Sequence, residues 1–299
     1  MIDGIHFLVT YQCTMDCDHC FLYCSPKAKG VFTLDQIKAV LDDTRNIPTV
    51  DNIFFEGGEP FLYYDMMLEG IEYATKMGLS VGIVTNGYWA KSKEKALKLL
   101  KPLKKLNILS IGLSDDVFHY GDQQDTPPKI AHAVCEELGI SNSFFCIEPP
   151  TIQLDCQKNS KGKPIVGGGT VFKGRAVEKL SDGLPFGNWQ EFSTCPHEDI
   201  AKPERIHLDP FGNVFICQGI SIANINQKPL SEIIKTYQPE KHPILGPLLQ
   251  GGPAQLAKIF DFNPSNEYIE PCHLCYMVRK QLMSKFKAEL APPQVYGTT

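Results

Sequence analysis

The chain has 299 residues, of which 43% are hydrophobic and 21% charged, so it can bury a sizeable core and wholesale disorder is excluded. Its net charge of −5 argues against a nucleic-acid-binding protein, whose footprint would be a basic surface. The length predicts about two domains, or one large α/β barrel with an appendage.

The N-terminal segment carries Asp3 and no basic run before its short apolar stretch, which argues against a secretory signal. No apolar stretch approaches the roughly 18 residues that a membrane span needs. We therefore expect no membrane partner and a cytoplasmic location. In that compartment disulfides are disfavoured, and clustered cysteines hold metal or do redox chemistry.

Short apolar runs alternate with amphipathic segments through the first half of the chain. The runs predict strands over residues 4–10, 52–57, 79–87, 107–115 and 142–149. The segments between them predict helices over residues 33–46, 63–78, 91–106 and 127–139. Thr33 is the expected N-cap of the first helix. Such alternation predicts βα units and a parallel sheet, with the chemistry in loops that follow the strands.

The pattern changes from about residue 154. Residues 156–176 are rich in glycine and lysine and predict a long loop that could act as a lid. Residues 205–217 contain two β-type runs around Asp-Pro-Phe-Gly-Asn, which predicts a hairpin. Short helices follow, then a last helix that is expected to reach residue 290, and residues 291–299 are expected to form a loose tail.

Three cysteines follow the first predicted strand with the spacing C-x3-C-x2-C: Cys13, Cys17 and Cys20. Structural zinc sites use four protein ligands, and closed ferredoxin clusters also take four cysteines. Three thiolates instead suit a [4Fe–4S] cluster whose fourth iron is open to a substrate or cofactor. Cys24 could close that iron, so its role is left open.

This triplet resembles the signature of the radical SAM superfamily, with His19 where an aromatic residue usually stands. A second motif resembles the one that the family carries after its second strand: Gly57, Gly58, Glu59 and Pro60. The resemblance implies that the open iron binds S-adenosylmethionine and that one electron releases a 5′-deoxyadenosyl radical. The two glycines would let the backbone approach the cofactor, and the glutamate would accept a hydrogen bond from its amino group.

Weaker resemblances extend this site. Ser114 and Asp115 fall where family members contact the ribose or carboxylate of the cofactor, although helix capping is an equal reading. Residues 172–176 resemble a Gly-Arg-Ala segment of the branch with a C-terminal cluster domain. Arg175 is therefore a candidate catalytic contact to substrate or cofactor, with a surface arginine as the alternative. Residues 85–87 fit the family's third strand or an ordinary turn.

Four further cysteines form a second group: Cys195, Cys217, Cys272 and Cys275. From the residues alone, a structural zinc site and an iron–sulfur cluster are equally good readings. Their order resembles the shortened auxiliary domain called Twitch, a relative of the SPASM domain. That resemblance implies a second [4Fe–4S] cluster, closed by four thiolates and suited to electron transfer.

The remaining cysteines and histidines carry less specific signals. Cys135, Cys146 and Cys156 are expected to be buried, with hydrogen-atom donation to a substrate radical as the alternative for the last two. His119, His197 and His207 are not spaced as a ligand set, and we expect them to be structural.

The resemblance implies an α/β fold: a partial (β/α)6, TIM-like barrel over residues 1–175. A small α+β auxiliary-cluster domain with a β-hairpin would follow over 176–290, then the tail. It also implies a net two-electron oxidation of a small molecule, with the auxiliary cluster as electron acceptor and a flavodoxin- or ferredoxin-type reductant.

Three alternatives remain: a redox-neutral epimerase, a peptide-modifying enzyme, and a zinc- or cluster-binding electron-transfer protein that is not an enzyme. Only twelve residues precede Cys13, so no leader-peptide recognition domain is expected there. That expectation favours a small-molecule substrate over a ribosomal peptide.

Overall fold

The protein is described by a computed structural model covering residues 2–156, 161–262 and 268–298. Its centre is an eight-stranded sheet. The strand order is β10 (Ser221–Asn224), β9 (Asn213–Phe215), β8 (Arg205–Leu208), β1 (Gly4–Leu8), β2 (Asn52–Glu56), β3 (Ser80–Thr85), β4 (Ser110–Ser114) and β5 (Asn142–Phe145). Strands β8 and β1 to β5 pair in parallel, whereas β9 and β10 are antiparallel. The predicted α/β fold with a parallel sheet is confirmed.

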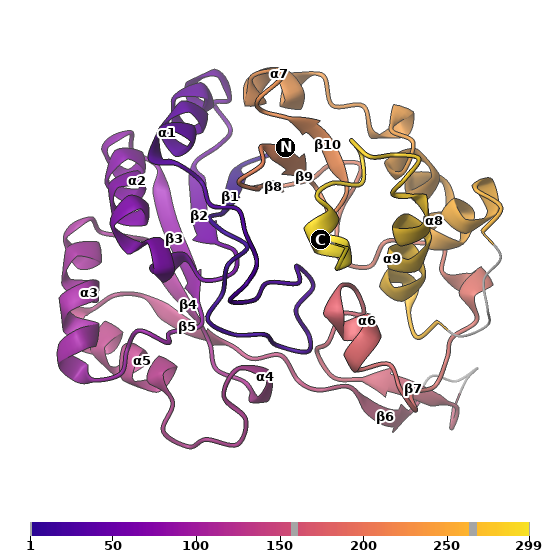
Figure 1. The fold of residues 1–299 in the computed structure, drawn as a ribbon, viewed down its shortest axis with the longest axis horizontal. Helices are drawn as coiled ribbons and strands as arrows, with labels where there is room; N and C mark the ends of the chain where they lie inside the picture. The colour runs from indigo at the N-terminus through magenta and orange to yellow at the C-terminus, as the bar shows by residue number, and fades with distance from the viewer. Residues whose placement is uncertain (1, 157–160, 263–267, 299) are drawn as a thin grey trace.

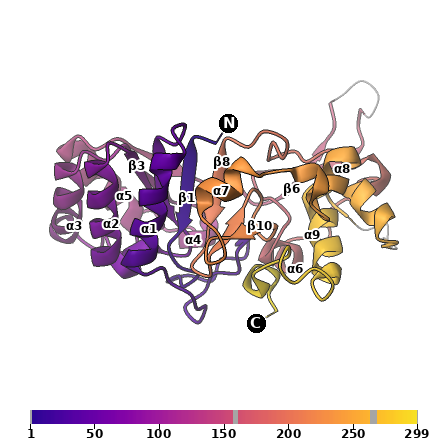
Figure 2. The ribbon, with the colours of Figure 1, turned by 90° about the horizontal axis from the view of Figure 1, so that it is seen from above.

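Four helices cover the outer face of strands β1 to β5 (Figures 1 and 2): α1 (Leu34–Asp43), α2 (Tyr64–Lys76), α3 (Lys93–Lys105) and α5 (Pro127–Leu138). Thr33 caps α1 in a capping box with Gln36, as its position predicted. A one-turn helix, α4 (Val117–Tyr120), follows β4 and is capped by Asp116. These helices leave the inner face of the sheet free to form a cavity.

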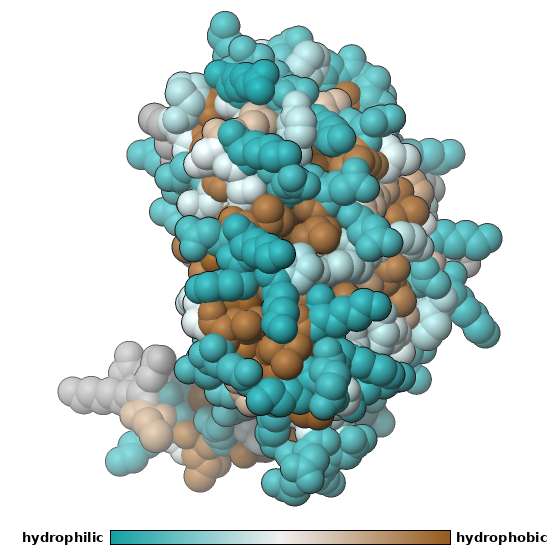
Figure 3. Space-filling model, turned by 90° about the vertical axis from the view of Figure 1, so that its left-hand side faces the viewer, coloured by the Kyte–Doolittle hydropathy of each residue, from teal (hydrophilic) through white to brown (hydrophobic). Residues whose placement is uncertain are grey.

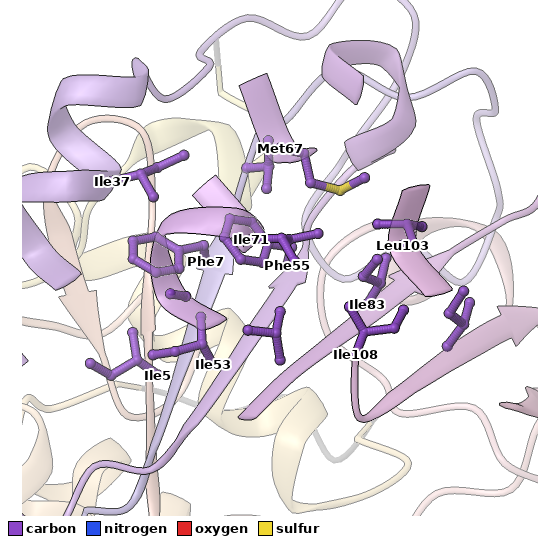
Figure 4. Packing of buried hydrophobic residues seen from close by; sticks show 14 of the residues in the cluster. Ile5, Phe7, Ile37, Ile53, Phe55, Met67, Ile71, Ile83, Leu103 and Ile108 are labelled. Carbon is purple, nitrogen blue, oxygen red and sulfur yellow. The ribbon is translucent and has the colours of Figure 1, made fainter. Parts of the chain in front are cut away.

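The main core lies between the sheet and these helices (Figure 4). Strand side chains such as Phe7, Phe55 and Ile83 are fully buried against Ile37 of α1 and Ile71 of α2. Since side chains alternate along a strand, the residues between them point to the inner face. The polar groups of the site described below come from those alternate positions.

The helix-covered side of the molecule is mostly hydrophilic, with apolar patches broken by polar side chains (Figure 3). The lysines of α3 belong to this solvated face, because its buried residues are Ala96, Leu100 and Leu103. Among the described residues, no helix combines the length and apolarity needed to cross a bilayer.

The second half of the chain wraps around the open side of the barrel (Figure 1). It contains the antiparallel pair β6 (Thr151–Leu154) and β7 (Pro164–Gly167), and the helices α6 (Arg175–Lys179), α7 (Leu230–Lys235), α8 (Leu245–Ile259) and α9 (Pro271–Leu282). Short 3-10 turns lie at Thr44–Asn46, Pro60–Tyr63, Trp189–Glu191, Pro239–Lys241 and Pro293–Tyr296. A second apolar cluster joins the loop after β1 to α8 and α9, so the two halves share one core.

The predicted hairpin over 205–217 is confirmed, but it is not a separate unit. Strand β8 pairs with β1 along its whole length, from Arg205 opposite Gly4 to Leu208 opposite Phe7. Strands β9 and β10 then extend the barrel sheet. Local patterns predict a hairpin's turn, but they do not identify the strand beside which it lies.

Three predictions for the second half were wrong. Residues 156–176 do not form one long loop, because β7 and the start of α6 lie within them; their residues 157–160 fall outside the described part. The last helix ends at Leu282 rather than near residue 290. The C-terminal segment is not loose: Tyr296 is fully buried and donates a hydrogen bond to the carbonyl of Gly219 at 2.6 Å.

Truncating Ile83 to alanine should cost about 2–5 kcal/mol of unfolding free energy, because its side chain is fully buried in the main core. Ile152→Ala is the matched control, since this strand isoleucine is 59% exposed and its loss should stay within about 0.5 kcal/mol. Urea unfolding of both variants measures the difference. Equal losses would contradict the assignment of the core.

Candidate active site

The cysteine loop, residues 9–33, leaves the end of β1 and returns to it before α1. It lies inside the barrel, as the dark indigo loop in the middle of Figure 1. The amide of Phe32 donates to the carbonyl of Val9 at 2.9 Å, and the amide of Cys13 donates to the carbonyl of Ser25 at 3.0 Å. These bonds close the loop on itself, so its thiols occupy fixed places.

Gly57 and Gly58 press directly against this loop. The amide of Gly58 donates to the carbonyl of Thr10 at 2.7 Å. A Cβ atom on Gly58 would lie 2.1 Å from the carbonyl oxygen of Gln12, and Gly57 has φ of +129°. Glycine is therefore required at both positions, as predicted, but the close neighbour is the cysteine loop itself.

The carboxylate of Glu59 is buried and fully engaged by donors. It accepts from the amide of Phe61 at 3.0 Å, the hydroxyl of Thr85 at 2.7 Å and the amide of Asn86 at 2.8 Å. Asn86 in turn lies 3.6 Å from the sulfur of Cys13 through its side-chain amide. The structure thus gives Glu59 a role in placing the turn after β3, while Pro60 begins the 3-10 turn that follows.

The three thiols of the loop sit in different electrostatic surroundings. Burial raises the pKa of Cys13 to about 11 and raises that of Cys17 further. Cys20 is the exception, since a hydrogen bond from the Cys24 thiol lowers its pKa. Cys24 is itself buried, and its amide donates to the sulfur of Cys20 at 3.3 Å. The thiol of Cys24 therefore stabilises the thiolate form of Cys20.

Arg175 holds the cysteine loop from the other half of the chain. Its guanidinium donates to the carbonyls of Cys17 at 2.6 Å and Cys24 at 2.9 Å, and it pairs with Asp16 at 2.6 Å. Its own amide donates to the carbonyl of Cys20 at 3.0 Å. The surface alternative is wrong, because the side chain is buried among loop carbonyls, and the predicted contact to substrate or cofactor stays a prediction.

A cavity of about 540 Å³ lies inside the barrel beneath the cysteine loop. Its lining includes all four cysteines of the loop, both glycines of the motif and Ser114. Asp115 is not part of this lining; the next residue, Asp116, is. Ser114 therefore faces the cavity, and its contact to the cofactor stays a prediction, as does that of Asp115.

Two groups of polar residues, each with at least one member in the cavity lining, were not predicted from the sequence. His19, Asp116 and His119 bring their ligand-type atoms within 4.8 Å of one another. His119 and Asp116 are hydrogen-bonded at 2.7 Å, while the buried Nδ1 of His19 has no partner among the described residues. Burial lowers the pKa of His19 to about 4, so its ring is neutral.

The second group is His6, Glu56 and His207, on adjacent strands β1, β2 and β8. The Nδ1 atoms of His6 and His207 lie 3.1 and 3.0 Å from the two oxygens of Glu56. Although burial opposes ionisation, hydrogen bonds from these histidines hold the pKa of Glu56 well below its usual range. Glu56 thus presents an anion to the cavity. The only sequence signal was the alternation that places His6 between two core residues of β1.

The second cysteine group also comes together in space. Cys195, Cys217, Cys272 and Cys275 lie close enough to influence one another's ionisation, and burial raises the pKa of Cys195, Cys272 and Cys275. The buried guanidinium of Arg279 donates to the carbonyls of Cys275 at 3.4 Å and Gln218 at 3.1 Å beside this group. Burial opposes ionisation of these thiols, and the cation of Arg279 partly offsets it for Cys195 and Cys275.

The three cysteines outside the loop and the second group differ in their burial. Cys135 is fully buried on α5, as predicted. Cys146 and Cys156 were predicted to be buried and are exposed: Cys146 follows the edge strand β5, and Cys156 follows β6 of the separate two-stranded sheet. The thiol of Cys146 donates to the carbonyl of Asp115 at 3.0 Å.

Residues 7–115 match the model of the Radical SAM superfamily. Two curated proteins of Bacillus subtilis (strain 168) are similar to part of the chain. The putative peptide biosynthesis protein YydG is 28% identical over 108 residues, which are 36% of this chain and 34% of that protein. The antilisterial bacteriocin subtilosin biosynthesis protein AlbA is 31% identical over 109 residues, which are 36% of this chain and 23% of that protein. The chain thus matches at most 34% of the length of these two relatives.

The crystal structure of BtrN in complex with AdoMet and 2-DOIA is similar over 91% of this chain and 92% of that one, with a TM-score of 0.55 and 16% identity. At this identity the likeness establishes the fold. The family match over residues 7–115 agrees with the resemblance seen in the two motifs, and the domain bounds and the Twitch-like domain stay predictions.

The residues present fit a [4Fe–4S] cluster with S-adenosylmethionine. Cys13, Cys17 and Cys20 come from one closed loop at the cavity wall, which is the donor set such a cluster needs. The unpartnered Nδ1 of His19 leaves a polar atom for a bound group. The cavity is also large enough for a cofactor-sized molecule.

Arg175→Ala should lower the free energy of unfolding by about 3 kcal/mol, because it leaves buried carbonyls of the cysteine loop without donors. Hydrogen exchange should rise within the loop. Arg205→Ala is the control, since this side chain is 44% exposed and pairs with Glu198. An equal effect of the two substitutions would contradict the role of Arg175 in holding the cysteine loop.

Burial raises the pKa of Glu59 to about 7. The folded state then binds more protons than the unfolded state between about pH 4.5 and 7, so this residue's contribution to stability falls as the pH rises through that window. Glu59→Gln removes the titration, although it leaves a donor facing the amide of Asn86. The stability difference between wild type and variant should therefore shrink from pH 5 to pH 8 in urea titrations. A constant difference would refute the shift.

Proposed function

We propose that this chain is a radical SAM enzyme whose first cluster is held by Cys13, Cys17 and Cys20. The observation that carries the proposal is the closed loop of three thiols over a cavity, pressed against Gly57 and Gly58. When bound there, the cluster and S-adenosylmethionine would supply a 5′-deoxyadenosyl radical. The chain's own task is to exclude water and hold one substrate C–H bond in reach.

Different residues would serve the cofactor in different ways. Ser114 and the two glycines face the cavity and would contact S-adenosylmethionine. Glu59 and Pro60 would help indirectly, by fixing the backbone of the turns that follow β3 and β2. Asp115 would help by placing its neighbour Asp116 in the cavity lining. Arg175 would hold the loop.

The reaction that we propose is a net two-electron oxidation of an alcohol-type carbon. The substrate loses a hydrogen atom to the 5′ carbon, then one electron, and its hydroxyl proton, which leaves a carbonyl group. The hydroxyl proton would be released to solvent, because the depressed pKa of Glu56 makes this cavity carboxylate a weak base. The second cysteine group would hold a closed cluster, and such a cluster would supply the one-electron acceptor.

A small molecule is the substrate class that we favour. A half-enclosed cavity of about 540 Å³ suits a compact polar substrate beside the cofactor. The crystal structure of BtrN, which has a similar fold, is a complex with AdoMet and 2-DOIA. A flavodoxin- or ferredoxin-type protein would deliver the electron that starts the cycle.

A peptide substrate is the second candidate. The names of the similar Bacillus proteins refer to peptide and bacteriocin biosynthesis. Large apolar side chains are also exposed on β5, on the β6–β7 pair and nearby: Phe144, Phe145, Ile152, Leu154, Ile165 and Phe186. Phe145 belongs to both this surface and the cavity lining, so a peptide lying there would reach the cavity.

One-electron reduction of the reconstituted protein with S-adenosylmethionine should yield 5′-deoxyadenosine and methionine. Replacing Cys13, Cys17 and Cys20 together by alanine should lower this yield at least about a hundredfold, as expected when a catalytic group is removed. Cys156→Ala is the control, because this cysteine is exposed and outside both groups. Equal yields in wild type and the triple variant would overturn the proposal.

A further inference from the structure

The side chain of Lys173 lies between the cavity and the second cysteine group. It lines the cavity, and its ammonium donates to Oε1 of Gln218 at 3.2 Å. Gln218 follows Cys217 directly in the chain. The same ammonium lies 4.7 Å from the ring centre of Phe21, on the cysteine loop. One cation therefore faces the substrate space and both cysteine sites.

The backbone on either side fixes the place of this lysine. The amide of Phe172 donates to Glu270 at 2.5 Å, just before α9 and its two cysteines. Gly174 has φ of +65°, and a Cβ there would lie 2.5 Å from Cα of Phe21. Arg175 then bonds to the cysteine loop. Residues 172–175 thus form a strap that touches both sites, and Lys173 is held at its middle.

The hydrogen bond from Lys173 orients the side-chain amide of Gln218. Lys173 can only donate, so Oε1 of Gln218 accepts and the Nε2 group points the other way. That Nε2 lies 3.3 Å from Nε2 of His207, which must accept, so His207 carries its proton on Nδ1 and donates to Glu56. This tautomer also argues against a metal between His6, Glu56 and His207, because the Nδ1 atom of His207 is not free as a ligand.

No carboxylate of the described residues forms an ion pair with Lys173. Its hydrogen-bond acceptor, Gln218, is neutral, and the carboxylate of Glu270 interacts with Lys173 without forming an ion pair. A positive charge near a cluster stabilises the form with one more electron, since net charge around the site sets its potential.

We propose that Lys173 raises the reduction potential of a cluster held by Cys195, Cys217, Cys272 and Cys275, and so makes it the acceptor for the electron that leaves the substrate radical. This inference rests on the proposed function. The balance is that of the oxidation above: the hydrogen atom goes to the 5′ carbon, the hydroxyl proton to solvent, and the electron to the second site. Lys173 is a tuning residue and takes no part in bond making.

The test is a redox titration of the reconstituted holoenzyme followed by electron paramagnetic resonance, on the cluster signal that S-adenosylmethionine does not change. At the wild-type midpoint, Lys173→Gln should lower the ratio of reduced to oxidised cluster about tenfold, which is a shift of about 59 mV for one electron. Lys173→Arg keeps the charge and should stay within about threefold of wild type.

Lys280→Gln is the matched control. It removes one positive charge from α9 itself, but this ammonium is already paired with Glu178 at 3.1 Å. In this variant the ratio of reduced to oxidised cluster, measured at the wild-type midpoint, should stay within about threefold of the wild-type ratio, because the lost charge was compensated.

An unmoved midpoint in Lys173→Gln, with iron and sulfide unchanged, would overturn the inference and leave the proposed function standing. Loss of second-site iron in both Lys173→Gln and Lys173→Met would also overturn it, since the lysine would then hold the site and not tune it. Absence of the second signal in wild type would instead overturn the two-cluster function.

Discussion

The buried guanidinium of Arg175 is the contact on which the site depends. A charge taken out of water is costly unless every donor finds an acceptor, and here the acceptors are loop carbonyls and Asp16. The loop that carries three thiols has no regular secondary structure of its own at those positions. Its shape is therefore imposed by the second half of the chain, through this side chain and the strap around it.

The same dependence explains why the two halves form one body. Strand β8 completes the barrel sheet beside β1, although it lies two hundred residues away in the sequence. The second apolar cluster packs the cysteine loop against α8 and α9. A change in the second half is thus transmitted to the first cysteine site through backbone contacts, and the barrel cannot be considered apart from the helices that close it.

Local sequence patterns predicted much of this structure. Alternating apolar runs predicted β1 to β5 and their helices, and the spacing of two motifs located the cysteine loop and the glycines that support it. What sequence could not supply was the pairing of distant segments: β8 with β1, Arg175 with the loop, and Glu56 with two histidines. Those contacts depend on the fold as a whole. Each histidine looked structural because its partners lie on other strands.

A chain of buried hydrogen bonds links the second cysteine group to the cavity. Hydrogen bonds run from Lys173 through Gln218 and His207 to Glu56. One end of this chain adjoins a cysteine of the second group, and the other end faces the cavity. An oxidation needs an electron acceptor within reach of the substrate, and a redox-neutral reaction does not.

The most direct test of this account is a count of iron and labile sulfide per chain after anaerobic reconstitution. We expect about eight irons per chain in wild type, at four per cubane cluster, and about four when Cys13, Cys17 and Cys20 are all replaced by alanine. About four falling to none, with zinc bound at the second group, would contradict the electron acceptor. No iron in either protein would contradict the radical chemistry altogether.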